Sequence, residues 1–101
     1  MKNLIHKDLI DEPVILEIAQ LFNDFGMWVV LKKFATTLPS ELKGMPPMKA
    51  WDISLAAILD GHKVFEIGCV RFEKDVPEAI RDLKPAIMNW LSQYALTEAR
   101  K

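Results

Sequence analysis

The chain has 101 residues and a formal net charge of −1, and half of its residues are hydrophobic. A chain of this length can bury one core, and so much apolar content argues against intrinsic disorder. We therefore expect one domain over residues 1–101, and the balanced charge excludes a polycationic or acidic tail.

The chain carries a single cysteine, Cys69, so an intramolecular disulfide is excluded. Residues 1–8 lack the apolar run and the small-residue cleavage site of a secretory signal. The longest apolar runs, residues 26–31 and 55–59, are far shorter than the ~20 residues that span a bilayer. These features predict a cytoplasmic protein without a membrane segment.

After an N-terminal segment over residues 1–11, a first helix is predicted over residues 12–25. Its start is marked by Pro13 after two acidic residues. Its end is marked by Gly26, which we expect in the left-handed conformation. The apolar stripe of this helix consists of Val14, Ile15, Ile18, Leu21, Phe22 and Phe25.

The β-branched and aromatic residues over 27–35 predict a strand. A rival interpretation continues the helix through Gly26, because Trp28, Leu31 and Ala35 keep its phase. Residues 36–47 follow as a connector, marked by three prolines and one glycine. The part of this connector over residues 38–47 is a candidate surface segment that closes over a partner.

Alternating apolar residues on both sides of Asp60-Gly61 predict a two-stranded hairpin over residues 51–72. A two-residue loop then implies a set of directly opposite pairs: Leu59 with His62, Ala57 with Val64, Leu55 with Glu66, Ile53 with Gly68 and Trp51 with Val70. The rival interpretation is a helix over residues 47–60 followed by a single strand. It rests on the helical spacing of Met48, Trp51, Leu55 and Ile58.

The last helix is predicted to begin after Asp75, an acidic N-cap that is followed by Pro77 in the first turn and by Glu78 at the third position. Its apolar stripe consists of Val76, Ile80, Leu83, Ile87, Leu91 and Tyr94. Pro85 lies inside this stripe and removes one backbone hydrogen bond. We therefore expect a bend or a restart of the helix near residues 81–85.

These elements define an α+β domain of order α-β-β-β-α, with both helices packed on one face of a small antiparallel sheet. This order resembles the double-stranded-RNA-binding domain in outline. That family's basic motif at the start of the last helix is absent here, where residues 75–82 read DVPEAIRD. The resemblance therefore implies the order of elements, and it transfers no residue and no activity.

The second face of the predicted hairpin carries large apolar side chains of one strand opposite small or polar residues of the other. These candidate partner-binding residues are Phe65, Ile67, Cys69, Ala56 and Ser54. Because two helices cover only one face of a small sheet, we expect this face to pack against a protein partner or a second copy of the chain. The alternative cover is the N-terminal segment, through Leu4, Ile5, Leu9 and Ile10.

Catalytic chemistry has weak support in the sequence. Cys69 is the best nucleophile candidate and His62 its candidate base, but an offset of seven on one strand places them on opposite faces about 23 Å apart. His6 and His62 lack the spacing of a metal site. Glu66 is either a buried carboxylate with a raised pKa or a residue that a bulge turns outward, and we favour the bulge. The four glycines are scattered, so no nucleotide-binding loop is predicted.

A small basic cluster interleaved with aromatic residues supports nucleic-acid binding as a second hypothesis. Its candidate residues are Lys32, Lys33, Lys43 and Lys49, with Trp28 and Phe34 nearby. Lysines beside an apolar strand more often form a solvated edge that discourages strand pairing. The sequence therefore favours a non-enzymatic, self-associating protein that acts by contact in regulation, inhibition or assembly, without a cofactor or a metal. A nucleic-acid-associated protein is the alternative, and a small enzyme is third.

Overall fold

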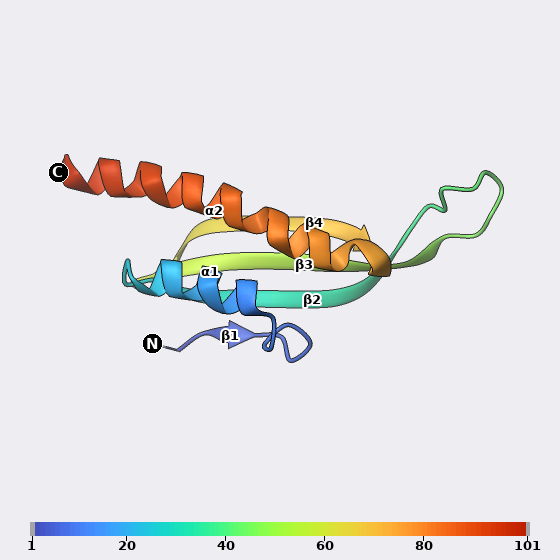
Figure 1. Cartoon of the computed structure of the whole chain (residues 1–101), viewed down its shortest axis with the longest axis horizontal. Coiled ribbons are helices and arrows are strands. Elements are labelled where there is room, and N and C mark those ends of the chain that lie inside the picture. The colour runs from blue at the N-terminus through green and yellow to red at the C-terminus, as the bar shows by residue number, and fades with distance from the viewer. Residues whose placement is uncertain (1, 101) are drawn as a thin grey trace.

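The structure is a computed structural model that describes residues 2–100; residues 1 and 101, the ends of the predicted domain, lie outside the described residues. Its elements are β1 (Leu4–Ile5), α1 (Pro13–Asn23), β2 (Trp28–Leu38), β3 (Met48–Leu59), β4 (His62–Phe72), the 3-10 turn η1 (Glu73–Asp75) and α2 (Val76–Ala99). Apart from the short β1, the elements follow the predicted order α-β-β-β-α (Figure 1). The prediction of an α+β domain is confirmed.

Helix α1 begins at Pro13, whose missing backbone donor costs nothing in a first turn. One of its faces is buried, through Ile15, Ile18, Ala19 and Phe22. Gly26 follows the helix with a φ of 78°, so the predicted left-handed residue is confirmed. Because β2 starts directly afterwards, at Trp28, the rival helix through Gly26 is wrong.

Strands β2, β3 and β4 form an antiparallel meander, and β1 adds a short parallel strand at the β2 edge. Leu4 pairs with Val30 and Ile5 with Leu31, so the sheet is mixed. Asn3 supports this pairing, because its side-chain oxygen accepts a hydrogen bond from the Val29 amide at 3.1 Å. The N-terminal segment therefore extends the edge of the sheet and does not cover its second face.

The turn between β3 and β4 confirms the predicted hairpin. Asp60 and Gly61 have φ values of 53° and 80°, and two successive positive angles are typical of the type I′ turn that this dipeptide favours. Residues 48–59 form strand β3, so the rival helix over residues 47–60 is wrong. The strands β2 and β3 are longer than predicted and pair as far as Leu38 with Met48. The connector therefore shrinks from residues 36–47 to residues 39–47.

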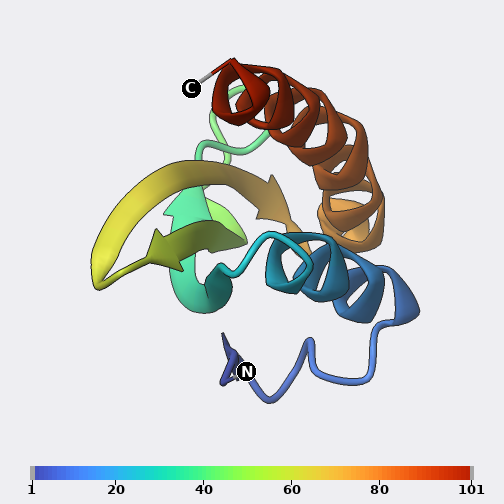
Figure 2. The same cartoon turned by 90° about the vertical axis from the view of Figure 1, so that its left-hand side faces the viewer.

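Helix α2 begins after Asp75, as predicted, although the Asp75 side chain makes no capping hydrogen bond and the turn η1 leads into the helix instead. The helix contains Pro85 and runs uninterrupted to Ala99, so the predicted restart does not occur. Figure 2 shows that its axis curves along its length.

Both helices lie on the same face of the sheet, as predicted (Figure 2). The core between them and the sheet is formed by apolar side chains of α1, β2, β3 and α2, among them Ile18, Phe22, Leu31, Leu55, Ile80 and Ile87. The two helices are also joined by an ion pair, in which Lys84 Nζ lies 2.7 Å from Glu17 Oε2. Within residues 2–100, no helix is both long and apolar enough to cross a membrane.

Candidate interaction surface

The alternation of side chains gives the sheet an inner and an outer face. The inner face carries Val29, Leu31, Ile53, Leu55 and Ala57, which are all buried beneath the helices. The outer face carries the residues between them, in the cross-strand pairs Val30 with Ala56, Lys32 with Ser54 and Phe34 with Asp52. No helix within residues 2–100 covers this outer face (Figure 2).

A β-bulge decides which side chains of β4 point to which face. The ladder is interrupted between Ala57 and Ile58, where Ile58 pairs with Lys63 and Ala57 pairs with Phe65, so Val64 is the extra residue. The predicted pair Leu59 with His62 is confirmed, but the predicted pairs beyond the bulge are wrong by one residue. Because side chains alternate with a period of two, a slip of one residue moves every later side chain to the opposite face.

The bulge divides the predicted partner-binding residues between the two faces. Phe65, Ile67 and Cys69 lie opposite Ala57, Leu55 and Ile53, and they pack against the core. Ala56 and Ser54 lie on the outer face, half-buried. The prediction that these five residues share one face is therefore wrong, and its physical cause is the single inserted residue.

Phe65 belongs to an aromatic cluster that closes one end of the core. Its ring centroid lies 4.8 Å from that of Trp90 and 5.7 Å from that of Phe22. Trp90 in turn stacks on Tyr94, with 5.5 Å between the ring centroids. The distances are typical of stabilising aromatic pairs, so Phe65 contributes to folding.

Glu66 is exposed and points outward, as the bulge interpretation predicts. Lys63 Nζ donates a hydrogen bond to its carboxylate at 2.5 Å. This hydrogen bond and the positive charge of Lys63 lower the pKa of Glu66 from its ordinary value. The idea of a buried carboxylate with a raised pKa is therefore wrong.

The structure separates Cys69 from its candidate base His62. Burial raises the pKa of the Cys69 thiol, which keeps it protonated, and the neighbouring Arg71 offsets this only in part. Cys69 lies on the inner face and His62 at the hairpin turn, so the structure does not bring them together. In the described part of the chain, no group of three or more His, Cys, Asp or Glu side chains is arranged to hold a metal ion.

The outer face carries a group of apolar side chains that we call the outer patch. Its members come from all four strands: Leu4, Trp28, Val30, Phe34, Ile58 and Val70. Phe34 is the most exposed of them, with 60% of its surface accessible. Charges of both signs are interspersed, with Lys32 and Asp52 in adjacent cross-strand rows. Such a surface combines apolar area with charged groups, as protein interfaces do.

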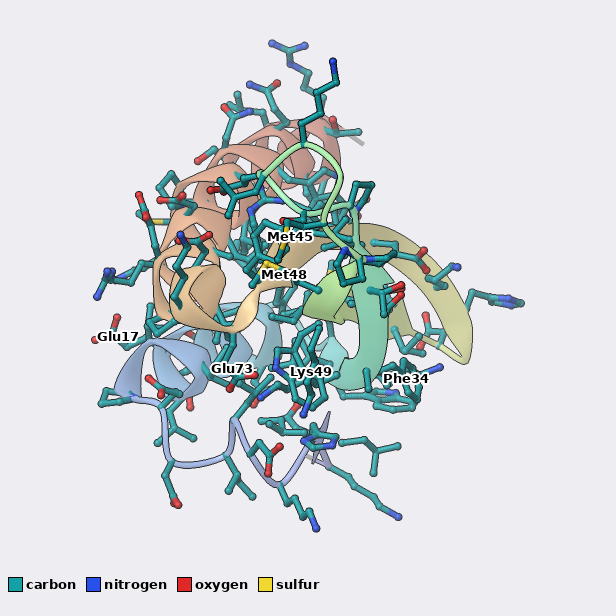
Figure 3. All side chains as sticks on the ribbon, turned by 90° about the vertical axis from the view of Figure 1, so that its right-hand side faces the viewer. Glu17, Phe34, Met45, Met48, Lys49 and Glu73 are labelled. Carbon is teal, nitrogen blue, oxygen red and sulfur yellow. The ribbon has the colours of Figure 1, made fainter. Side chains whose placement is uncertain are left out.

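Residues 39–47, which we call the arm, continue the line of β2 and β3 and project beyond the helices (Figure 1). Nearly all of the arm is exposed, including Leu42 and Met45 with 67% and 57% of their surfaces accessible. Two local bonds shape it, because the Met45 amide donates to the Leu42 carbonyl and the Leu42 amide donates to the Ser40 hydroxyl. Figure 3, viewed from this end, shows Phe34 pointing away from the helices.

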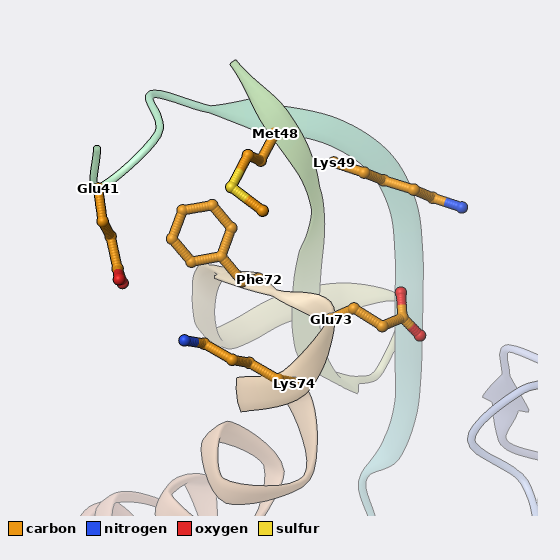
Figure 4. Close-up of a pocket in the computed structure, with 6 residues that line it drawn as sticks. All are labelled: Glu41, Met48, Lys49, Phe72, Glu73 and Lys74. Atoms are coloured by element: carbon orange, nitrogen blue, oxygen red, sulfur yellow. The ribbon is translucent and has the colours of Figure 1, made fainter. Parts of the chain in front are cut away.

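A hollow of about 370 Å³ lies at the base of the arm, lined by Glu41, Met48, Lys49, Phe72, Glu73 and Lys74. Figure 4 shows Met48 and Phe72 facing each other across it, with Glu41 and Lys74 on the same side. Most of the surface that these six residues expose to the hollow is apolar, so the hollow can receive an apolar side chain. Glu41 and Lys74 form no ion pair within the part of the chain that the structure describes.

The four lysines of the nucleic-acid hypothesis do not form one surface. Lys33 lies on the inner face with only 9% of its side chain exposed, 3.7 Å from Asp8 and 4.4 Å from the ring centroid of Trp51. Lys49 contacts the same ring at 4.6 Å. Lys32 points to the outer face and Lys43 lies on the arm. The structure thus separates the cluster into three places.

Sequence reasoning missed the site around Trp51. The Trp51 indole N–H donates a hydrogen bond to Glu73, and Lys33 and Lys49 both lie over its ring. Alternation alone places Lys49 and Trp51 on one face of β3, and this spacing was the available signal. We compared the chain with known protein families, curated proteins and solved structures, and none of them matches it.

Proposed function

We propose that this protein acts by protein–protein contact, without catalysis, and that it self-associates through the outer patch. Its role would then be regulation, inhibition or assembly. The observation that carries the proposal is the outer face itself, which is rich in apolar side chains and has no helix over it within residues 2–100. Exposed apolar patches of monomers are often sites of interaction.

The free energy available at this face is substantial for a small domain. Burying a fully exposed phenylalanine stabilises a protein by roughly 1.5 to 3 kcal/mol, so Phe34, at 60% exposure, has about 1 to 2 kcal/mol to gain. Trp28 adds a large half-buried ring on the same face. Aromatic residues of this kind are the usual anchors of interfaces.

A second copy of the chain suits this face. A two-fold interface brings the same patch of both copies together, so the patch must be complementary to itself. Lys32 and Asp52 occupy adjacent rows, so each copy offers both a positive and a negative charge to an identical face. The net charge of −1 produces little repulsion between copies.

The proposal extends to the compartment and to the rival classes. A single, protonated cysteine suits the reducing cytoplasm, where we place the protein. Nucleic-acid binding remains the alternative, with less support, because Lys33 is largely buried and already lies near Asp8. A small enzyme is third, since the candidate nucleophile Cys69 packs against the core.

Sedimentation of the wild-type protein and of Phe34→Ser tests the proposal. A two-fold interface contains Phe34 twice, so the substitution should remove about 3 kcal/mol and weaken the dimer about 100-fold. Leu96→Ser is the matched control, because Leu96 is also exposed but lies on α2, away from the outer face. This control should leave the dimer unchanged.

Circular dichroism checks that both variants keep their secondary structure. A wild-type protein that stays monomeric at high micromolar concentration, with no co-purifying protein, would overturn the proposal. Salt-sensitive retention of such a monomer on nucleic acid would favour the alternative instead.

A further inference from the structure

We infer that the dimer is closed by its arms, with the arm of each copy lying across the hollow at the base of the other copy's arm. This inference rests on the proposed function and assigns the arm a role within it. The two-fold axis would then pass near Phe34 and Met48, at the end of the outer face from which the arm projects.

The outer face is small compared with the interface of a stable dimer. Three strands of 11 or 12 residues span about 35 Å by 14 Å, or roughly 500 Å² in projection. A stable dimer buries about 800 Å² of surface on each partner. Contact beyond the outline of the three strands would add to the buried surface, and the arm is continuous with the outer face through the pair Leu38 and Met48.

The arm has the composition of a contact segment. Leu42 and Met45 are two of its nine residues, and both leave more than half of their surface in water. In the isolated chain, neither side chain belongs to the core. The partner's hollow, with Met48 and Phe72 in its lining, offers an apolar surface of matching chemistry.

The sheet at the base of the arm is braced, which fixes the end of β3 from which the arm projects. The Trp51 indole N–H donates a hydrogen bond to Glu73, which ties β3 to the turn η1. Lys33 and Lys49 lie over the same indole ring, at 4.4 Å and 4.6 Å from its centroid. Preorganisation of this kind lowers the entropic cost of association.

When the arms are exchanged between two copies, the charge on each arm is opposite to the charge beside the partner's hollow. Glu41 on the arm and Lys74 beside the hollow have opposite charges, and they form no ion pair with each other within residues 2–100. When the arms cross, Glu41 of each copy can pair with the partner's Lys74. A two-fold axis creates this pair twice.

The first experiment shortens the arm. Because Leu38 and Met48 are directly opposite each other, a two-residue Asn-Gly turn can replace residues 39–47 without changing the register. No residue of the arm belongs to the buried core, so the circular dichroism spectrum and the melting temperature should stay as in the wild type. The dissociation constant of the dimer should rise at least tenfold.

The second experiment distinguishes contacts between copies from contacts within one copy. Glu41→Lys and Lys74→Glu should each weaken self-association several-fold, because each places two like-charged pairs across the axis. An equimolar mixture of the two variants should regain wild-type association. In the mixed dimer, both crossing pairs are again of opposite charge. Pairing within one copy cannot produce this rescue, since each variant still carries its own like-charged pair.

The outcomes separate this inference from the proposed function. If the shortened protein dimerises as tightly as the wild type while Phe34→Ser still weakens the dimer, the arm has no role and only the inference fails. If the two charge variants weaken association but their mixture shows no rescue, the arms do not exchange and the inference is also overturned. A wild-type monomer would overturn the proposed function and the inference together.

Discussion

Deleting Val64 should leave the fold intact, although it removes the third residue of β4. Val64 is the extra residue of the bulge. Without it, a regular hairpin with a two-residue loop still pairs Ile58 with Lys63 and Ala57 with Phe65, which are the pairs of the wild-type structure. Every later residue of β4 therefore keeps its face. Val64 has 38% of its surface exposed, so the deletion should cost about 1 kcal/mol of stability.

Deleting Glu66 is the matched control, because it also removes one residue of β4 but has a different consequence. The ladder can recover its register beyond the deletion only by pairing Val64 with Ala57 and turning Phe65 outward. Phe65 would then leave Phe22 and Trp90, whose ring centroids now lie 5.7 Å and 4.8 Å away. The loss of this half-buried ring and its aromatic contacts should cost about 3 kcal/mol.

Urea unfolding followed by tryptophan fluorescence measures both costs, and thermal unfolding gives a second value. For a domain of this size, the expected fall in melting temperature is about 4 °C without Val64 and at least about 12 °C without Glu66. Near-ultraviolet circular dichroism should change in the second variant, because Trp90 loses its neighbour. If removal of Val64 destabilises the protein as much as removal of Glu66, the register assigned to β4 is wrong.

Three further predictions concern single residues. Burial raises the pKa of Cys69, so its thiol should react slowly at pH 7 in the folded protein. When the pH exceeds the ordinary thiol pKa of 9.0, the wild type should lose stability relative to Cys69→Ala, because the thiol ionises first in the unfolded state. Equal stability differences at pH 7 and pH 10 would refute this. Lys63→Met should raise the pKa of Glu66 toward its ordinary value of 4.5, as measured by NMR titration. At concentrations too low for a dimer, trypsin should cut the folded protein first at Lys43 on the exposed arm, and resistance there would show that the arm packs within one copy.

The elements that could be predicted from the sequence are those with local signals. Pro13 and Gly26 bracket α1, and Asp60-Gly61 selects the hairpin turn, because each of these residues restricts or frees the backbone at its own position. The order of elements and the placement of both helices on one face followed from these signals. Sheet pairing over long distances in the chain has no such signal.

The faces of β4 were predicted wrongly because a turn fixes the register only as far as the ladder is regular. The pair Leu59 with His62 is correct, and one inserted residue then reverses the assignment of Phe65 and Ile67. The visible sign of the insertion was Glu66, a charged residue at a predicted inner position. Treating that misfit as decisive would have placed Phe65 and Ile67 in the core.

The candidate site was only partly predictable. The number of helices predicts that one face of the sheet stays uncovered, but the residues on that face depend on the bulge. Strand β1 could not be foreseen either, because two residues carry no periodic pattern and their parallel pairing depends on Asn3 reaching Val29. The site around Trp51 combines residues from three separate segments, and no local rule connects them.

The strand order β1-β2-β3-β4 has a consequence for how the chain folds. Two of its three pairings join strands that have no helix between them in the chain, so most of the sheet can form without closing a long loop. The helices present the opposite case, because Lys84 and Glu17 meet across 67 residues of sequence. We expect the β2–β3–β4 meander to form early in the transition state and the contact between the helices to form late. Substitutions in the meander should then slow folding, whereas substitutions between the helices should mainly speed unfolding.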